Sequence, residues 1–247
     1  MSAAEDNQPL PVKEVVSRTC RELLSFVRSP VPPAGRHPLG RTRAIALFTV
    51  LGIDIGIVAV FLIAVFSAEA AGAAIPATPD FGMSPLFLFL FATTFAPVLE
   101  EVIFRGWLSG RKADLEFAGT ILGLAAVTVA GFALFSEGTI IWLSVFAVGA
   151  VAAWLRWGVR RKTHQAMPGW FARHYAKIVY LSSVAFGTVH LTNYDTFSAM
   201  HLVMVLPQTI GGLLLAFTRT RLGLSASIVQ HALFNALVFG ADLAFGS

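Results

Sequence analysis

Long apolar stretches, separated by short polar segments, fill most of the chain. Seven of these stretches are close to the roughly 20 residues that an α-helix needs to cross a bilayer. Such helices satisfy their own backbone hydrogen bonds, as the interior of a membrane requires. The pattern therefore predicts an all-α fold, a polytopic transmembrane bundle of about seven spanning helices. Their expected limits are residues 44–67, 85–108, 118–135, 139–157, 178–194, 199–217 and 224–245.

The first 43 residues are polar by comparison with the rest of the chain. Apolar residues recur at helical spacing between residues 12 and 27, with cations among them. This pattern suits a helix that lies on an anionic membrane face, and equally a short helix packed on the protein itself, and the sequence leaves both open. We expect a cytosolic N-terminal arm over residues 1–43 and a membrane domain over residues 44–247. The cations are Lys13, Arg18, Arg21 and Arg28.

Composition and charge sharpen this picture. The chain is 56% hydrophobic and 13% charged, with a mean hydropathy of +0.72, whereas soluble domains carry about 25% charged residues. These values exclude a disordered chain and argue against a soluble globule. The single cysteine, Cys20, excludes an intramolecular disulfide and a cysteine-based zinc site. The net charge of +4 and the pI of about 9.6 would also suit a nucleic-acid binder, but the placement of the charges indicates membrane orientation, so we expect no nucleic-acid partner.

All the cations fall on one side of the membrane if the chain has seven spans. The 18 lysines and arginines lie in the N-terminal arm, after the second span, between the fourth and fifth spans, and between the sixth and seventh. The positive-inside rule therefore predicts a cytosolic N-terminus and an external C-terminus. The composition, rich in Ala, Gly, Val and Arg, favours a bacterial plasma membrane. The opposite loops carry only acids: Glu69, Asp80, Glu137, Asp195 and Asp242.

Two adjacent carboxylates lie inside the second expected span. Ionisable groups within a membrane are costly, so they are functional candidates by default. Glu101 and Arg105 stand at i and i+4 on one helix face, where they can pair. Glu100 points about 100° away and stays available to a polar cavity. Pro97 removes a backbone hydrogen bond one turn earlier, which predicts a kink or local opening beside the carboxylates. The alternative is a purely structural ion pair.

Histidines in two other expected spans lie at a similar depth. Counted from the nearest cytosolic cations at 1.5 Å per residue, Glu100, His190 and His231 lie about 16, 20 and 15 Å inside the membrane. Asn235 shares a helix face with His231 and can orient it. Taken singly, each histidine also suits simple packing, and the pair on the last span suits an interhelical polar clasp. Asp54 lies at a comparable depth, but we leave it outside the catalytic set.

The three motifs are EEVIFR at residues 100–105, FGTVH at 186–190 and HALFN at 231–235. In this order, each on an expected span, they resemble the CAAX prenyl protease and bacteriocin-processing family of intramembrane proteases, the group that contains the type II CAAX endopeptidases. The resemblance covers roughly residues 85–110 and 178–240. In that family the first two motifs lie on successive helices, whereas here an inserted helical hairpin is expected between them, over residues 118–157.

The resemblance implies an intramembrane endopeptidase that hydrolyses a peptide bond through a glutamate-activated water. Such a reaction needs a general base, groups that orient this base, a group that positions water, and donors to the tetrahedral oxyanion. The residues implied for these four roles are, in the same order, Glu100; Glu101 with Arg105; His190; and His231 with Asn235.

A divalent metal such as zinc is an open alternative. One carboxylate and two imidazoles make a plausible zinc first shell with a vacant position, here Glu100, His190 and His231. The family is commonly filed with metalloproteases, although a glutamate mechanism without a metal is also argued for it. The sequence leaves metal dependence open.

The expected partners are the lipid bilayer and a peptide or protein substrate in the membrane. A CAAX-like enzyme implies a lipidated C-terminus as substrate, whereas other family members imply bacteriocins or other peptides. Two other functions compete. One is a non-catalytic membrane interaction or bacteriocin-immunity protein on the same scaffold. The other is a proton-coupled transporter with Asp54, Glu100 and the histidines as a relay, against which stands the lack of repeat symmetry between the halves.

Overall fold

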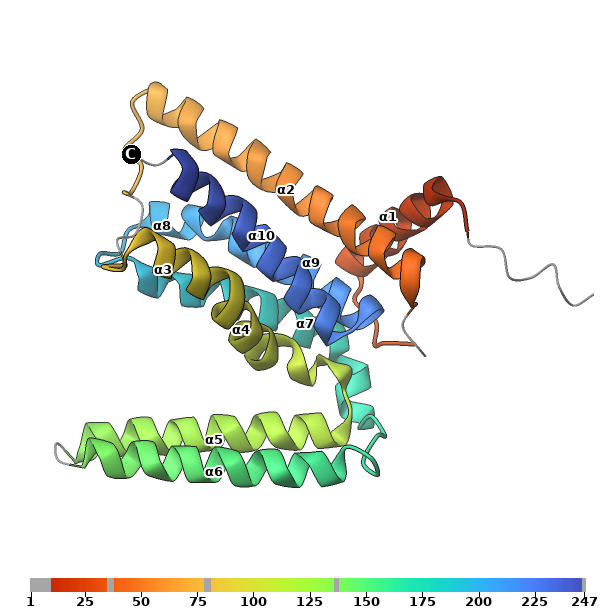
Figure 1. Ribbon diagram of the computed structural model, residues 1–247, viewed down its shortest axis with the longest axis vertical. Coiled ribbons are helices and arrows are strands. Elements are labelled where there is room, and N and C mark those ends of the chain that lie inside the picture. Colours follow the sequence, from red (N-terminus) through yellow and green to blue (C-terminus); the bar gives the residue numbers. More distant parts are fainter. Residues whose placement is uncertain (1–9, 35–37, 78–80, 136–137, 246–247) are drawn as a thin grey trace, which may run out of the picture. The chain divides into compact units, whose positions relative to one another are not determined.

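The structure, a computed structural model, describes residues 10–34, 38–77, 81–135 and 138–245, and every regular element within these ranges is helical. The predicted all-α fold is therefore confirmed (Figure 1). The elements are α1 (Val12–Arg28), α2 (Gly40–Ala70), α3 (Pro85–Leu90), the π-helix η2 (Phe91–Phe95), α4 (Ala96–Arg105), the short 3-10 helix η3 (Gly106–Ser109), α5 (Lys112–Leu134), α6 (Thr139–Arg160), α7 (Gly169–Val189), the 3-10 helix η4 (His190–Asn193), α8 (Ala199–Met204), α9 (Leu206–Leu222) and α10 (Leu224–Phe245).

Six helical segments in the described residues are long and apolar enough to cross a membrane. They coincide with six of the seven spans expected from the sequence. Large apolar side chains such as Val60, Ile63 and Phe66 lie exposed on them, as lipid-facing side chains do. The chain is thus a multi-pass integral membrane protein. The six segments are Gly40–Ala70, Pro85–Ser109, Lys112–Leu134, Thr139–Arg160, Ala199–Leu222 and Leu224–Ala241.

The remaining expected span, residues 178–194, forms most of α7 and all of η4. With 21 residues α7 is long enough to cross a bilayer, but its composition keeps it outside the group of six apolar segments. Arg173, His174 and Lys177 lie in its first half. The orientation inferred from the cations relied on seven spans, so the cytosolic N-terminus stays a prediction.

By their internal contacts the residues form two compact units. The first comprises residues 1–105 and 175–247, and the second residues 106–174. In the first unit, α10 packs against α2, α3, η2, α4 and α9. In the second, α5 and α6 lie side by side as a hairpin (Figure 1). A hairpin was expected over residues 118–157; that it is an insertion stays a prediction.

The N-terminal helix α1 packs on the protein itself. One face of it is buried, with Val15 and Phe26 almost inaccessible, and this face contacts α2 and α9. The ring of Phe26 meets that of Phe217 edge-on, with 5.5 Å between ring centroids. The Tyr180 hydroxyl donates a hydrogen bond to the Val27 carbonyl oxygen at 2.9 Å. Of the two arrangements that the sequence left open, the structure shows the packed one, while other apolar residues of α1 remain exposed.

Candidate active site

The Glu101–Arg105 pair forms the buried base of the site. Arg105 Nη1 donates to Glu101 Oε1 at 2.8 Å, with both side chains inaccessible to solvent, so the i, i+4 pairing expected from the sequence is present. The guanidinium also lies over the ring of Phe186, 3.8 Å from its centroid, which is cation–π geometry. A buried charge is tolerated only when it is paired, and this arrangement gives Arg105 two partners.

The last turn of α4 is fixed by side chains from two other helices. Ser182 of α7 donates from its hydroxyl to the Phe104 carbonyl oxygen at 2.8 Å. Arg219 of α9 donates from Nε to the Arg105 carbonyl oxygen at 2.9 Å. The final carbonyls of a helix have no partner within the helix, so these contacts satisfy them. They also hold the carboxylate-bearing turn rigidly against α7 and α9.

His231 lies between the two carboxylates. Its Nδ1 is 3.2 Å from Glu101 Oε1, and its Nε2 is 3.8 Å from Glu100 Oε2. A carboxylate can only accept, so the first contact places a proton on Nδ1. Glu101 Oε1 therefore accepts from Arg105 and from His231 together. The result is that Glu101 is committed to holding other groups and His231 is held in one orientation, facing Glu100.

Glu100, unlike Glu101, does not hold another side chain of the site by a hydrogen bond. Its side chain is 28% exposed, whereas that of Glu101 is fully buried. Glu100 Oε2 is itself enclosed and receives no hydrogen bond from any described residue. An unsatisfied buried acceptor is costly in a structure that has no use for it. Glu100 is thus the carboxylate available to bind a water or a substrate group.

His190 reaches the same region through Phe186. The chain leaves α7 at this point, and His190 is the first residue of η4. Its Nδ1 is 2.7 Å from the Phe186 carbonyl oxygen, so Nδ1 donates and Nε2 is left as an acceptor. The Phe186 ring meets both imidazoles edge-on, at centroid distances of 4.9 Å for His190 and 5.8 Å for His231. The two histidines therefore flank one aromatic ring.

Asn235 is engaged with the backbone of the second span. Its Nδ2 donates to the Ala92 carbonyl oxygen at 2.8 Å. That carbonyl lies in the π-helix, where the Ala96 N–H bonds to Phe91 instead. The next donor along the chain would be Pro97, which has no N–H. The local opening predicted beside Pro97 is therefore present as a π-helix, and Asn235 satisfies the oxygen that it frees.

The site residues expected from the sequence thus fall into three groups. Glu100, Glu101, Arg105 and His231 are in direct contact or within 3.8 Å of a neighbour in the group. His190 approaches them across the Phe186 ring. Asn235 lies one turn beyond His231 with its amide on Ala92.

A buried polar chain next to the site was not predicted from the sequence. Gln230 is fully buried and accepts from the Thr218 hydroxyl at 2.5 Å, while its Nε2 donates to Asp54 Oδ2 at 3.5 Å. Asp54 is 4% exposed. The sequence did offer a signal for Asp54, because its expected depth in the membrane matched that of the catalytic candidates. Gln230 carried no signal of its own beyond its position next to His231.

The candidate donors Glu100, His190 and His231 do not form a zinc-like site. Among the described residues, no three His, Cys, Asp or Glu side chains converge as metal ligands would. Glu100 and His231 face each other at 3.8 Å, and His190 does not join them as a third donor. A catalytic zinc takes three protein ligands, so this arrangement of side chains does not fit one.

Comparison with known protein families gives one match. The family described as type II CAAX prenyl endopeptidase Rce1-like matches residues 82–169 and 159–237, which together cover more than half of the chain and include all three motifs. No curated protein and no solved structure shows a significant match to the chain.

Proposed function

This chain belongs to the Rce1-like family of type II CAAX prenyl endopeptidases, and from that membership we propose that Glu100 activates a water to hydrolyse a peptide bond in a membrane-associated substrate. One observation carries the proposal. Glu100 is the partly exposed carboxylate of the site, its Oε2 receives no hydrogen bond from the described residues, and it faces a histidine that contacts Glu101.

The first step is attack by water. The Glu100 carboxylate takes a proton from the water, and the resulting hydroxide oxygen bonds to the carbonyl carbon of the substrate peptide. The electron pair of the C=O bond moves to the oxygen and forms the tetrahedral oxyanion. His190 Nε2, left as an acceptor by the bond from Nδ1 to Phe186, orients the second hydrogen of the water.

The oxyanion needs a donor that is already in position. His231 supplies it in the doubly protonated form, with Nδ1–H on Glu101 and Nε2–H on the side of Glu100. The proton on Glu100 then passes to the amide nitrogen as the C–N bond breaks. The products are a carboxylic acid and an amine, and Glu100 is again a carboxylate.

For Asn235 we propose a positioning role in place of the oxyanion role that the resemblance implies. One of its two amide hydrogens is used on the Ala92 carbonyl, so we assign it to positioning. It fixes α10, and with it His231, against the π-helix that precedes the carboxylates. Glu101 and Arg105 likewise position rather than react.

The substrate class follows from the family alone. We propose a membrane protein or peptide with a lipidated, CAAX-like C-terminus, cleaved at the membrane. A non-catalytic binding or immunity protein on the same scaffold remains the alternative that the experiment must separate.

The test compares new peptide termini in cells that express the wild type or Glu100→Gln at equal levels. Mass spectrometry of membrane-associated proteins should find termini that appear only with the wild type. Glu69→Gln, the same change at an exposed glutamate of α2, is the control and should behave as wild type. If wild type and Glu100→Gln give the same termini while both are abundant and folded, the protease proposal is wrong and the binding alternative replaces it.

A further inference from the structure

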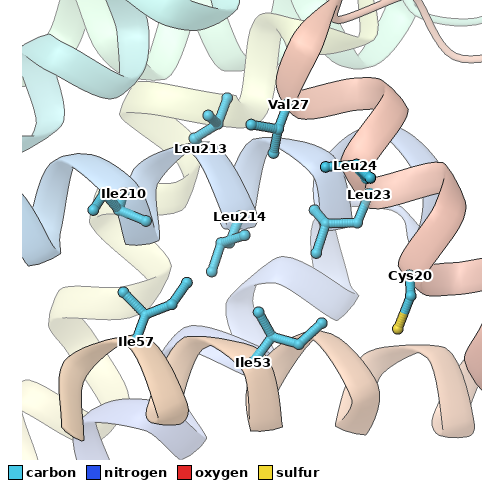
Figure 2. Close-up of a pocket in the computed structure, with 9 residues that line it drawn as sticks. All are labelled: Cys20, Leu23, Leu24, Val27, Ile53, Ile57, Ile210, Leu213 and Leu214. Atoms are coloured by element: carbon cyan, nitrogen blue, oxygen red, sulfur yellow. The ribbon is translucent and has the colours of Figure 1, made fainter. Parts of the chain in front are cut away.

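An apolar groove of about 390 Å³ lies between α1, α2 and α9 (Figure 2). Its lining side chains are all apolar apart from the thiol of Cys20. Each of the three helices contributes to it, as the labelled side chains in Figure 2 show. Among them are Leu24 from α1, Ile53 and Ile57 from α2, and Ile210 and Leu213 from α9. None of these residues belongs to the catalytic candidates.

The groove extends from Leu23, on the buried face of α1, to the exposed flank of the helix at Leu24. Val15 and Phe26 on the buried face are almost inaccessible, whereas Leu24 in the groove wall is 52% exposed. If α1 served only to cover α2 and α9, we would expect apolar side chains to be packed on this flank as well. Instead, this flank of α1 leaves aliphatic side chains exposed at the surface of the bundle.

Two arginines lie near Leu24 on the exposed surface of α1. Arg21 and Arg28 stand at i−3 and i+4 relative to Leu24, so they share its face of the helix, one turn to either side. Both are exposed, and Arg21 is steadied by a hydrogen bond from Nη1 to the Ser17 hydroxyl at 2.6 Å. Long cationic side chains keep their charge at the membrane surface while their stems lie on apolar groups. The groove therefore combines an apolar interior with a cationic rim.

We propose that this groove binds one anionic phospholipid, with an acyl chain in the groove and the phosphate between Arg21 and Arg28. The apolar lining matches a hydrocarbon chain, and the rim matches a phosphodiester in charge. An isoprenoid chain would use the lining but would leave both guanidinium groups without a partner, so the rim favours the phospholipid. Basic helices beside a bilayer bind anionic headgroups by the same attraction. The inference is independent of the proposed peptidase activity.

Cys20 allows a direct test because it is the chain's only cysteine and lines the groove. The full-length Glu100→Gln protein is placed in nanodiscs of phosphatidylcholine alone, or with phosphatidylglycerol of the same acyl chains added. The rate of Cys20 alkylation by an uncharged maleimide is then measured. Phosphatidylglycerol should slow alkylation several-fold, and native mass spectrometry should show one retained phosphatidylglycerol.

Four variants assign the effect to the groove. Arg21→Gln and Arg28→Gln should each weaken phosphatidylglycerol binding roughly fivefold, the equivalent of about 1 kcal/mol per cation. Arg18→Gln, on a different flank of α1 and paired with Glu22, is the charge control and should have little effect. Ile57→Trp should fill the groove and abolish retention.

Ile63→Trp, at an exposed position of α2 outside the groove, is the matched control for Ile57→Trp and should retain the lipid. Equal protection by phosphatidylcholine would overturn the headgroup assignment. Protection by S-farnesylcysteine methyl ester but not by phosphatidylglycerol would assign the groove to an isoprenoid and overturn the proposal. No protection and no retained lipid would also overturn it. Because the assay uses the Glu100→Gln background and reads binding, its result does not depend on proteolysis.

Discussion

Asn235 of α10 holds the backbone carbonyl oxygen of Ala92 at 2.8 Å, where the π-helix and Pro97 together leave that oxygen without a donor from its own helix. We expect Asn235→Leu to destabilise the protein by about 1–3 kcal/mol, the usual cost of an unsatisfied buried acceptor. Adding Pro97→Ala should recover part of the loss because it restores an N–H at the right place. Thermal unfolding in detergent measures both, with Asn193→Leu, an exposed position in η4, as control. No recovery in the double variant would contradict this explanation.

The Glu101–Arg105 pair should behave as a buried ion pair. Arg105→Met leaves an unpaired carboxylate inside the bundle and should cost about 3–5 kcal/mol of stability. The double variant Glu101→Leu/Arg105→Met should lose less than the sum of the single variants, because it leaves no isolated charge. The matched control is the Glu116–Arg160 pair of the hairpin, at 2.9 Å and partly exposed, where Arg160→Met should cost about 0–1 kcal/mol. Strict additivity at residues 101 and 105 would argue against this coupling.

Gln230 should matter through Asp54. Gln230→Leu removes the amide that donates to Asp54 Oδ2, so we expect a loss of about 1–3 kcal/mol. The double variant Asp54→Leu/Gln230→Leu should be more stable than Gln230→Leu alone, since neither polar group is then left unsatisfied. Gln208→Leu is the control, because Gln208 Oε1 already lacks a partner and little is lost with it. Chemical denaturation compares the three variants with the wild type, and a double variant no more stable than Gln230→Leu would contradict this explanation.

Gly187, inside the second motif, is a packing requirement. A Cβ at this position would collide with the Thr209 side chain and come within 3.0 Å of the Thr209 backbone nitrogen. Gly187→Ala should therefore destabilise by about 1–3 kcal/mol, as overpacking does. Thr209→Ala should relieve only part of this, since the backbone contact persists. Gly52→Ala, where a Cβ meets nothing within 4 Å, should be tolerated. A shift in melting temperature reports each case.

A mechanism without a metal makes a direct prediction about chelation. Active wild-type protein should keep its peptidase activity after prolonged dialysis against a chelator, because Glu100 and His231 act as base and donor. Elemental analysis of the wild type and of the His190→Ala/His231→Ala double variant gives the complementary measurement. Stoichiometric zinc that accompanies activity and is absent from the double variant would restore the three-ligand alternative.

Local spacing was enough to predict the pairing of Glu101 with Arg105. The i, i+4 relation placed Arg105 on Glu101 because helix geometry alone decides it. Counting rise per residue put Glu100 and His231 at one level, and the structure brings them to 3.8 Å. The expected span at residues 178–194 matches only the second part of α7, which begins at Gly169 and carries Arg173 and Lys177 in its first half.

Contacts between helices could not be read from the sequence. The partner of Asn235 is a backbone oxygen more than a hundred residues away, and it is free only because a π-helix forms there. This contact depends on which helices become neighbours, and the periodicity of the sequence does not determine that.

The division of the chain at Arg105 and Tyr175 has an evolutionary consequence. All the candidate catalytic residues lie in the unit made of residues 1–105 and 175–247, and none lies in residues 106–174. The proposed chemistry therefore constrains two separate stretches of the chain directly, and it places no direct constraint on the stretch between them. Relatives of this protein are expected to vary more within residues 106–174 than at the three motifs.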